Sequence, residues 1–270
     1  MYDYHVIELP TKAVIMARGL GRRMRAEKPG TALTDEQQRI ADSGIKALIP
    51  FADGKTLLEK ILANITAAGF SDVCLVIGPE HDAIRDHCAT KGIAVTFVVQ
   101  EEARGTADAV LAAESAVGDE LFLVVNSDNL YPVEGLRRLR ETNRPAMLAF
   151  EREALIVRSN IAADRIASFA TVEIDDDGNL RRIVEKPDVV EPRSFVSMNA
   201  WLFSSEIFAA CRAIEPSPLR KEYEITAAVQ FAIDHLEVEV AAVKTDEGVL
   251  DLSDRADIES AGRILATRNQ

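Results

Sequence analysis

Residues 12–25 read KAVIMARGLGRRMR, and this stretch decides the fold. An apolar run at 12–16 predicts a buried strand that stops at a short loop containing Gly19 and Gly21. Glycine allows a close approach that a side chain would block, and successive N–H groups in such a turn form an anion-binding concavity. Arginines stand beside the loop at positions 18, 22, 23 and 25. The stretch predicts a polyphosphate site; the alternative is a structural turn followed by a solvated basic helix.

Two familiar phosphate motifs do not fit this loop. A P-loop needs Gly, four residues and then Gly-Lys-Ser/Thr, and the sequence contains no such run. A dinucleotide-binding fingerprint needs a third glycine where Met24 stands. Other motifs of the chain are therefore needed to distinguish a polyphosphate site from a structural turn.

Composition restricts the class of protein. The 270 residues are 47% hydrophobic, which is enough to bury the core of one compact α/β domain covering 1–270; two small domains are the alternative. The formal net charge of −13 argues against nucleic acid or an anionic membrane as a partner, so a nucleotide site has to be a local island of positive charge. No apolar run approaches the roughly 20 residues that span a bilayer, and the start MYDYHVIELPTK shows no export signal. We expect a cytoplasmic protein.

The cysteines and histidines form no metal-binding or disulfide pattern. Cys74, Cys88 and Cys211 are odd in number and widely spaced, which predicts buried reduced thiols. His81 and His87 lie six residues apart, off one helical face, and are expected at the surface.

Short apolar strands alternate with amphipathic helices up to residue 145, which predicts a parallel sheet covered on both faces. Ligands of such sheets bind beyond the carboxyl ends of the strands. The polar segment 26–45 is read as an insert with a short helix that begins at the capping box Thr34–Gln37. A second capping box, Thr56–Glu59, opens a helix that ends near Gly69. Up to residue 145 the predicted strands are 12–16, 73–77, 94–99 and 121–125, and the predicted helices are 80–90 and 106–116. Beyond residue 145 we predict strands at 146–150, 194–203, 238–244 and 248–252, a hairpin around Asp177-Gly178, and helices at 222–235 and 254–267.

Two carboxylates stand in unusual positions. Asp128 follows the fourth apolar strand, where it suits a Mg²⁺ ion that shares phosphate oxygens, or else caps the helix after Pro132. Asp251 lies inside an apolar edge strand, and an unpaired buried carboxylate is costly. It either shares the metal with Asp128 or pairs with an arginine.

Two lysines and a glutamine also allow two interpretations each, one functional and one structural. Lys46 precedes the apolar run ALIPF, and Lys186 stands where a hairpin strand is stopped by proline. Each suits a phosphate as a point charge or is simply solvated. Gln100, just past the third strand, either pairs with a nucleobase edge or satisfies loop backbone.

Eight motifs, in order along nearly the whole chain, resemble those of the sugar-1-phosphate nucleotidyltransferases. They are IMARGLGRRMRA, IKALIP, QEEARGTADAV, VVNSDN, EKP, MNAW, KEYEITA and VLDLSD. The resemblance implies the GT-A-like, Rossmann-like nucleotidyltransferase fold: an α/β protein with a mostly parallel central sheet, helices on both faces and a small antiparallel sugar-binding part. It also implies a nucleotide-binding half at 1–145 and a sugar-phosphate-binding half at 146–270.

The activity implied by the resemblance is of the EC 2.7.7 class, a step of NDP-sugar biosynthesis. A sugar 1-phosphate attacks the α-phosphorus of a nucleoside triphosphate, and NDP-sugar and pyrophosphate form with the help of Mg²⁺. We favour UTP or dTTP with a hexose 1-phosphate. The alternatives are a GT-A-type glycosyltransferase and a non-catalytic regulatory homologue that binds nucleotide sugars. The oligomeric state is left open.

The resemblance also assigns residues. It implies catalytic roles for Arg23, Lys46 and Lys186; nucleotide binding by Ala17, Gly19, Leu20, Gly21, Gln100, Gly105 and Thr106; sugar binding by Glu185 and Asn199; and metal binding by Asp128 and Asp251. The chain departs from the family pattern at four places. Arg18 and Arg22 replace a small residue and a threonine, Trp201 stands where glycine is common and is expected to refill part of the sugar pocket, and Ser-Asp-Arg at 253–255 replaces Gly-Thr-Pro.

Overall fold

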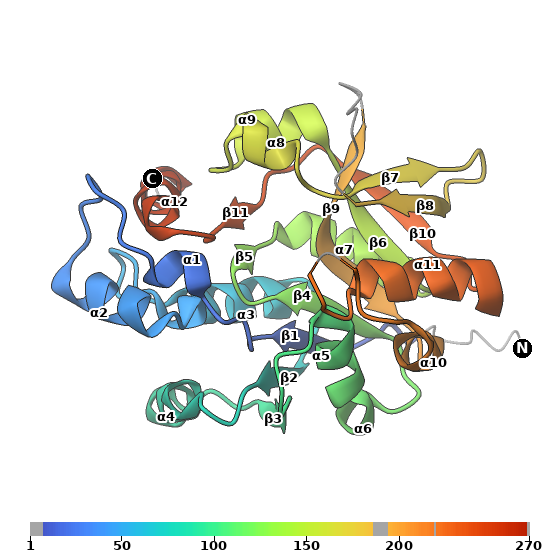
Figure 1. Cartoon of the computed structure of the whole chain (residues 1–270), viewed down its shortest axis with the longest axis horizontal. Coiled ribbons are helices and arrows are strands. Elements are labelled where there is room, and N and C mark those ends of the chain that lie inside the picture. Colours follow the sequence, from blue (N-terminus) through green and yellow to red (C-terminus); the bar gives the residue numbers. More distant parts are fainter. Residues whose placement is uncertain (1–7, 186–193, 219, 269–270) are drawn as a thin grey trace, which may run out of the picture.

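A mixed nine-stranded sheet forms the centre of the molecule in the computed structural model, which describes residues 8–185, 194–218 and 220–268 (Figure 1). Along its main path the strand order is β10-β6-β9-β4-β1-β2-β3, and the hairpin β7–β8 attaches to β9. The strands of this sheet are β1 (Lys12–Met16), β2 (Asp72–Ile77), β3 (Thr96–Val99), β4 (Phe122–Asn126), β6 (Ala146–Glu151), β7 (Thr171–Ile174), β8 (Leu180–Val184), β9 (Phe195–Phe203) and β10 (Ala241–Thr245).

Strand direction confirms the expected fold class. β1 pairs in parallel with both β2 and β4, and β6 pairs in parallel with β10. β9 runs antiparallel between β4 and β6, and so joins the first half of the chain to the second within one sheet. The carboxyl ends of β1 and β4 lie at the same edge, where the residues after Met16 and Asn126 meet.

Alternating residues of the strands feed two hydrophobic clusters, one on each face of the sheet. Ala13 and Ile15 belong to the cluster covered by α3 and α7, whereas Val14 and Met16 belong to the cluster covered by α5, α10 and α11. Both faces are thus covered, as the uninterrupted apolar strands predict. The helices are α1 (Arg22–Arg25), α2 (Asp35–Ser43), the 3₁₀ turn η1 (Lys46–Leu48), α3 (Leu57–Ala67), α4 (Asp82–Lys91), α5 (Thr106–Ala112), α6 (Glu114–Val117), α7 (Val133–Glu141), α8 (Arg152–Arg158), α9 (Ala163–Ile166), α10 (Glu206–Ala213), α11 (Ile225–Leu236) and α12 (Arg255–Arg268).

Both predicted capping boxes are present. Thr34 accepts from the backbone of Gln37 at the start of α2, the helix of the insert, and the side chain of Gln37 returns the bond. Thr56 and Glu59 do the same at the start of α3. These reciprocal bonds satisfy N–H groups that a helix start leaves unpaired, so the two helix starts were readable from sequence.

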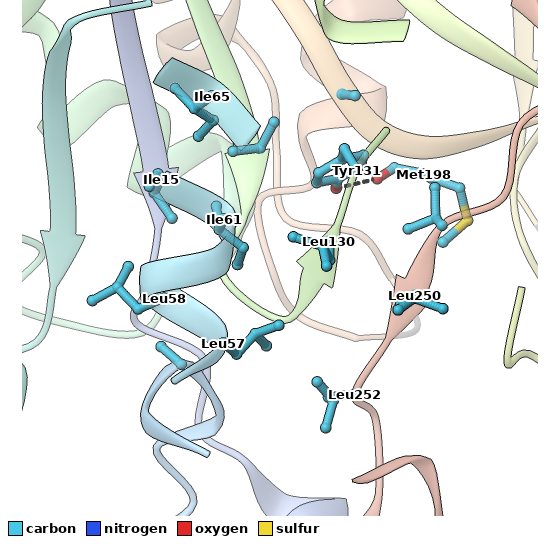
Figure 2. Packing of buried hydrophobic residues seen from close by; sticks show 14 of the residues in the cluster. Ile15, Leu57, Leu58, Ile61, Ile65, Leu130, Tyr131, Met198, Leu250 and Leu252 are labelled. Carbon is cyan, nitrogen blue, oxygen red and sulfur yellow. Dashed lines mark hydrogen bonds between the residues drawn. The ribbon is translucent and has the colours of Figure 1, made fainter. Parts of the chain in front are cut away.

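A second, two-stranded sheet brings the C-terminal part to the end of β4. β5 (Asn129–Leu130) pairs antiparallel with β11 (Leu250–Asp251), and the backbone N–H of Leu252 donates to the carbonyl of Asp128 at 2.9 Å. Figure 2 shows Leu130 and Leu250 facing each other beside the apolar side chains of α3, and the Tyr131 hydroxyl donating to the carbonyl of Met198. Residues 129–130 and 250–252, which are far apart in sequence, therefore lie together beyond the end of β4.

Several expectations about single positions were tested. The three cysteines are free and buried, as predicted. His81 is buried, not exposed, because its Nδ1 accepts a hydrogen bond from the backbone of Gly78. The helix predicted at 106–116 is broken at Ala113 into α5 and α6. Within the described ranges, none of the helices has the length and apolar character needed to cross a bilayer.

Candidate active site

A cavity of about 600 Å³ opens at the carboxyl edge of β1 and β4. Its walls come from the loop after β1, the turn η1, the loop after β3, the loop after β4 and the middle of β9. These segments were singled out separately in the sequence, and the fold brings them together. The predicted site residues that line the cavity are Ala17, Gly19, Leu20, Gly21, Arg23, Lys46, Gln100, Gly105, Thr106, Asp128 and Asn199.

The glycine-bearing loop is held by close backbone packing. Gly21 has φ of +60°, and a Cβ atom at this position would lie 2.2 Å from the carbonyl oxygen of Gly44. Only glycine fits here without strain. Arg22 and Arg23 follow on α1 with exposed side chains, and neither has a hydrogen-bond or ion-pair partner among the described residues. Both line the cavity, and so does the carboxylate of Glu222.

Lys46 and Asp128 form an ion pair across the cavity. The Nζ atom of Lys46 lies 2.9 Å from Oδ2 of Asp128, and the two side chains are 17% and 29% exposed. Burial works against the charged form of Lys46, but the charge and hydrogen bond of Asp128 outweigh it and raise the pKa of the lysine. The capping alternative for Asp128 is not what the structure has, since α7 begins at Val133 with Pro132 as its N-cap residue and without a side-chain cap.

Asp251 sits behind this pair, buried and already bonded. Its Oδ1 accepts from Asn129 at 2.8 Å, and its Oδ2 pairs with Arg165. Burial, followed by the charge of Asp128, raises the pKa of the Asp251 carboxyl to about 6. Arg165 also binds both oxygens of Asp257 at 2.9 Å. Of the two alternatives for Asp251, the arginine pairing is therefore present, and its role as a metal ligand stays a prediction.

Gln100 is 4% exposed and is held by its own loop. Its Nε2 donates to the carbonyl of Gly105 at 3.1 Å and to Asp108 at 2.7 Å. Arg18, the residue that departs from the family pattern, reaches across and donates to the carbonyls of Gln100 and Glu101. Arg18 thus joins the glycine-bearing loop to the loop after β3. The bond from Gln100 to its loop backbone is present, and its role toward a nucleobase stays a prediction.

Asn199 lies at an irregularity of β9. The pairing with β6 shifts between Met147 and Ala149, and Asn199 there adopts φ of +57°, a conformation that asparagine tolerates better than most residues. Trp201 donates from Nε1 to Oδ1 of Asn199 at 3.4 Å. The expectation that Trp201 refills the sugar pocket was wrong: it is fully buried in the sheet and stacks on Phe203.

The EKP motif is seen only in part. Glu185 is exposed and accepts from the hydroxyl of Thr226 at 2.8 Å, and it does not line the cavity. Lys186 lies outside the described residues. The predicted sugar side of the site is therefore represented in the described chain by Asn199.

Sequence reasoning missed three side chains that shape the site. Ser253 lines the cavity, and Asn126 lines it at the end of β4. Arg165, which neutralises Asp251, gave no signal because it lies on the short helix α9, 86 residues away from its partner in the sequence. Only the unexplained carboxylate in an apolar strand indicated that a cation had to be near.

The fold and the cavity together define an α/β protein with a cleft lined by basic side chains at the carboxyl edge of its sheet. The chain belongs to the nucleotidyl transferase family, whose model matches residues 12–266. The family resemblance read from the eight motifs is confirmed.

Two relatives are named for sugar-nucleotide synthesis. The chain is 33% identical over 233 residues to a glucose-1-phosphate thymidylyltransferase of Streptomyces antibioticus, with 83% of this chain and 58% of the relative covered. It is 26% identical over 259 residues to the UTP–glucose-1-phosphate uridylyltransferase AglF of Haloferax volcanii, covering 94% and 96%. The chain spans little more than half the length of the Streptomyces relative, and nearly all of AglF.

A solved structure has the same fold. A UDP-glucose pyrophosphorylase in complex with UDP-glucose superposes with a TM-score of 0.74, covers 96% of this chain and all of its own, and shares 18% sequence identity. This likeness supports the mostly parallel, helix-covered sheet that the sequence predicted.

Proposed function

We propose that the protein is a sugar-1-phosphate nucleotidyltransferase that joins UTP or dTTP to a hexose 1-phosphate and releases pyrophosphate. The observation that carries the proposal is the gathering of Arg23, Lys46 and Asp128 around the cavity that the glycine-bearing loop also lines. The relatives named above act on glucose 1-phosphate with thymidylyl or uridylyl donors. The cytoplasm, where nucleoside triphosphates are made, is the compartment this function requires.

The chemistry needs alignment and charge neutralisation more than a nucleophilic side chain. An oxygen of the sugar phosphate, already an anion near neutral pH, attacks the α-phosphorus, and the bond from that phosphorus to the bridging oxygen of pyrophosphate breaks. Arg23 would neutralise the departing β,γ-phosphates, and Lys46 would hold the triphosphate near the α-phosphorus. Lys186 and Glu185 remain the predicted contacts of the sugar phosphate and the sugar, together with Asn199.

A divalent cation, Mg²⁺, is part of the proposal. Mg²⁺ binds through one or two carboxylates plus substrate phosphates, so a complete protein cage is not needed. Asp128 suits this role, because it faces the cavity and only its Oδ2 has a partner among the described residues. Asp251 would have to exchange Asn129 or Arg165 for the metal. The ion would supply neutralisation of phosphate charge.

The test is a screen for pyrophosphate release that crosses the five common nucleoside triphosphates with a panel of sugar 1-phosphates, with and without Mg²⁺. We expect one pyrimidine nucleotide and one hexose 1-phosphate to give pyrophosphate and NDP-sugar in equal amounts. A parallel assay supplies NDP-sugars and a sugar acceptor, and release of nucleoside diphosphate in that assay would indicate the glycosyltransferase. Binding without turnover in both assays would indicate the regulatory homologue.

A further inference from the structure

Arg255 is a buried cation at a distance from the cavity that no motif explains. It is the first residue of α12 and is 2% exposed. Burying a guanidinium is costly unless its donors find acceptors. The partners of Arg255 therefore show what the structure uses it for.

Those partners belong to two elements from the first part of the chain. Nε of Arg255 donates to the carbonyl of Met24 at 2.9 Å, and Nη2 donates to the carbonyl of Arg25 at 3.0 Å. Nη2 also pairs with Oδ1 of Asp42 at 2.6 Å. Figure 1 shows the consequence: α12 lies beside α1 and α2. One side chain thus joins the C-terminal helix, the arginine-bearing helix and the insert.

The helix that Arg255 holds needs outside support. α1 has only four residues, far fewer than a helix needs for independent stability in water, and its last carbonyls have no partners inside the helix. Arg255 satisfies two of these carbonyls and places a positive charge at the end of the helix where a cation is favourable. A second contact, from Arg25 to the carbonyl of Ser43 at 2.8 Å, also joins α1 to the insert.

The same segment is tied to the opposite wall of the cavity. Three residues before Arg255, the backbone of Leu252 donates to the carbonyl of Asp128, and the intervening Ser253 lines the cavity. Residues 252–255 therefore run from the carboxylate side of the site to the arginine side. The Ser-Asp-Arg departure from the family pattern and the insert 26–45 meet in this one contact.

We propose that Arg255 is a positioning residue for the phosphate-binding arginines: it fixes α1 against Asp42 of the insert, and so orients Arg22 and Arg23 toward the cavity without touching the ligand. The inference rests on the proposed function in assuming that the cavity takes the phosphates of a nucleotide. It predicts that affinity for pyrophosphate depends on Arg255 even though the side chain lies outside the cavity.

The experiment measures calorimetric binding of inorganic pyrophosphate, with Mg²⁺, to wild type, Arg255→Met and Arg255→Lys. Because displacement of a positioned group by about 1 Å costs up to about 10²-fold, we expect the methionine variant to bind about tenfold or more weakly and the lysine variant to lie between it and wild type. Steady-state kinetics should show a raised KM for the nucleotide, with the KM for the sugar 1-phosphate nearly unchanged.

Two matched variants separate positioning from stability. Ala261→Gly weakens α12 at a buried residue six positions beyond Arg255, and Arg263→Met removes a cation on α12 that pairs with Glu259. Both should bind pyrophosphate as wild type does, even where Ala261→Gly lowers Tm as much as Arg255→Met. If Arg255→Met does not fold, Asp42→Asn carries the test, because asparagine keeps an acceptor for Arg255 but removes the counter-charge. This variant should weaken pyrophosphate binding with a smaller loss of Tm than Arg255→Met.

The inference is overturned if Arg255→Met binds pyrophosphate as tightly as wild type, or if Arg255→Lys and Asp42→Asn both do. It is also overturned if the wild-type protein itself binds no pyrophosphate. A weakening that Ala261→Gly reproduces in full assigns Arg255 to stability alone and also overturns it. The proposed function fails separately: a wild type that makes no NDP-sugar but binds pyrophosphate in an Arg255-dependent way leaves this inference standing.

Discussion

Within the described part of the chain, Arg23 makes no hydrogen bond or ion pair that would account for its position by the stability of the fold. Its side chain is exposed, faces the cavity and has no partner among the described residues, although it affects the titration of Lys46. We expect Arg23→Met to lower kcat/KM by about 10²-fold, as loss of an electrostatic stabiliser does, with Tm unchanged. Arg39→Met, which removes an exposed arginine of α2, is the control. Near wild-type turnover in Arg23→Met would remove Arg23 from the site.

Asp128 has two duties, since it neutralises Lys46 and faces the cavity. Asp128→Asn keeps the shape but leaves the lysine without its counter-charge. We expect kcat/KM to fall by about 10²-fold and half-saturation with Mg²⁺ to move to higher concentration. Asp119→Asn, at an exposed position, should change neither. An unaltered Mg²⁺ titration in Asp128→Asn would show that the ion binds elsewhere.

His81 predicts an acid-sensitive stability. Burial lowers the pKa of His81; Glu80 opposes this, and Arg18 works with it. The neutral ring accepts from Gly78, so protonation breaks that bond. An unfolded histidine titrates near pH 6.5, so the unfolded state takes up the proton first and the free energy of unfolding decreases as pH falls below about 6.5.

The test of this prediction is His81→Asn, which keeps an acceptor for Gly78 but does not titrate. Denaturant unfolding between pH 7 and pH 5 should give a shallower loss of stability in the variant than in wild type. Equal slopes in the two proteins would show that His81 does not contribute.

At the residue scale, sequence predicted the side chains whose positions follow from strand ends. Asp128 and Gln100 follow apolar strands, and parallel strands bring such ends together. Lys46 was recognised from its motif, since it lies in the turn η1 and not at a strand end. Arg165, Arg255 and the burial of His81 were not predictable, because their partners are set by the packing of segments distant in sequence. The position of Trp201 was misjudged because it packs in the hydrophobic cluster with Met147 and Phe203 and not at the cavity wall.

At the element scale, the loop before α1 tests how close packing shapes a site. Gly21 has a positive φ and no room for a Cβ atom, whereas Gly19 has no heavy atom within 4 Å of that position. We expect Gly21→Ala to cost about 2 kcal/mol or more of stability, and Gly19→Ala to leave stability nearly unchanged. Thermal unfolding of the two variants makes the comparison.

The KM for the nucleotide should order Gly19→Ala and Gly21→Ala differently from their Tm values. If the open space beside Gly19 receives the nucleotide, Gly19→Ala should raise the KM for the nucleotide while Tm stays constant. Equal losses of stability in Gly19→Ala and Gly21→Ala would contradict the packing described for Gly44.

Helix starts and strands were the elements best predicted, because capping boxes and apolar runs are local signals. The break at Ala113 and the short strand β5 were missed. β5 has two residues and exists only because β11 pairs with it, so no local pattern announces it.

At the scale of the whole molecule, β9 makes the two halves of the chain one sheet. The chain's one tryptophan, Trp201, lies on β9 and pairs with Val124 of β4 and Met147 of β6. We therefore expect the tryptophan fluorescence and far-UV circular dichroism to report the same urea transition. A dichroism curve with two steps, only one of them seen by Trp201, would show that residues 1–145 and 146–270 unfold separately.

The pairing of β11 with β5 has a consequence for biosynthesis. The first 130 residues contain most of the cavity's lining. However, the hydrogen bonds to the carbonyl of Asp128 and to the carbonyls of α1 come from Leu252 and Arg255. During synthesis, strands β1 to β4 are complete long before residues 250–255 have been added. The cavity therefore gains the contacts that hold Asp128 and α1 only after this later segment has left the ribosome.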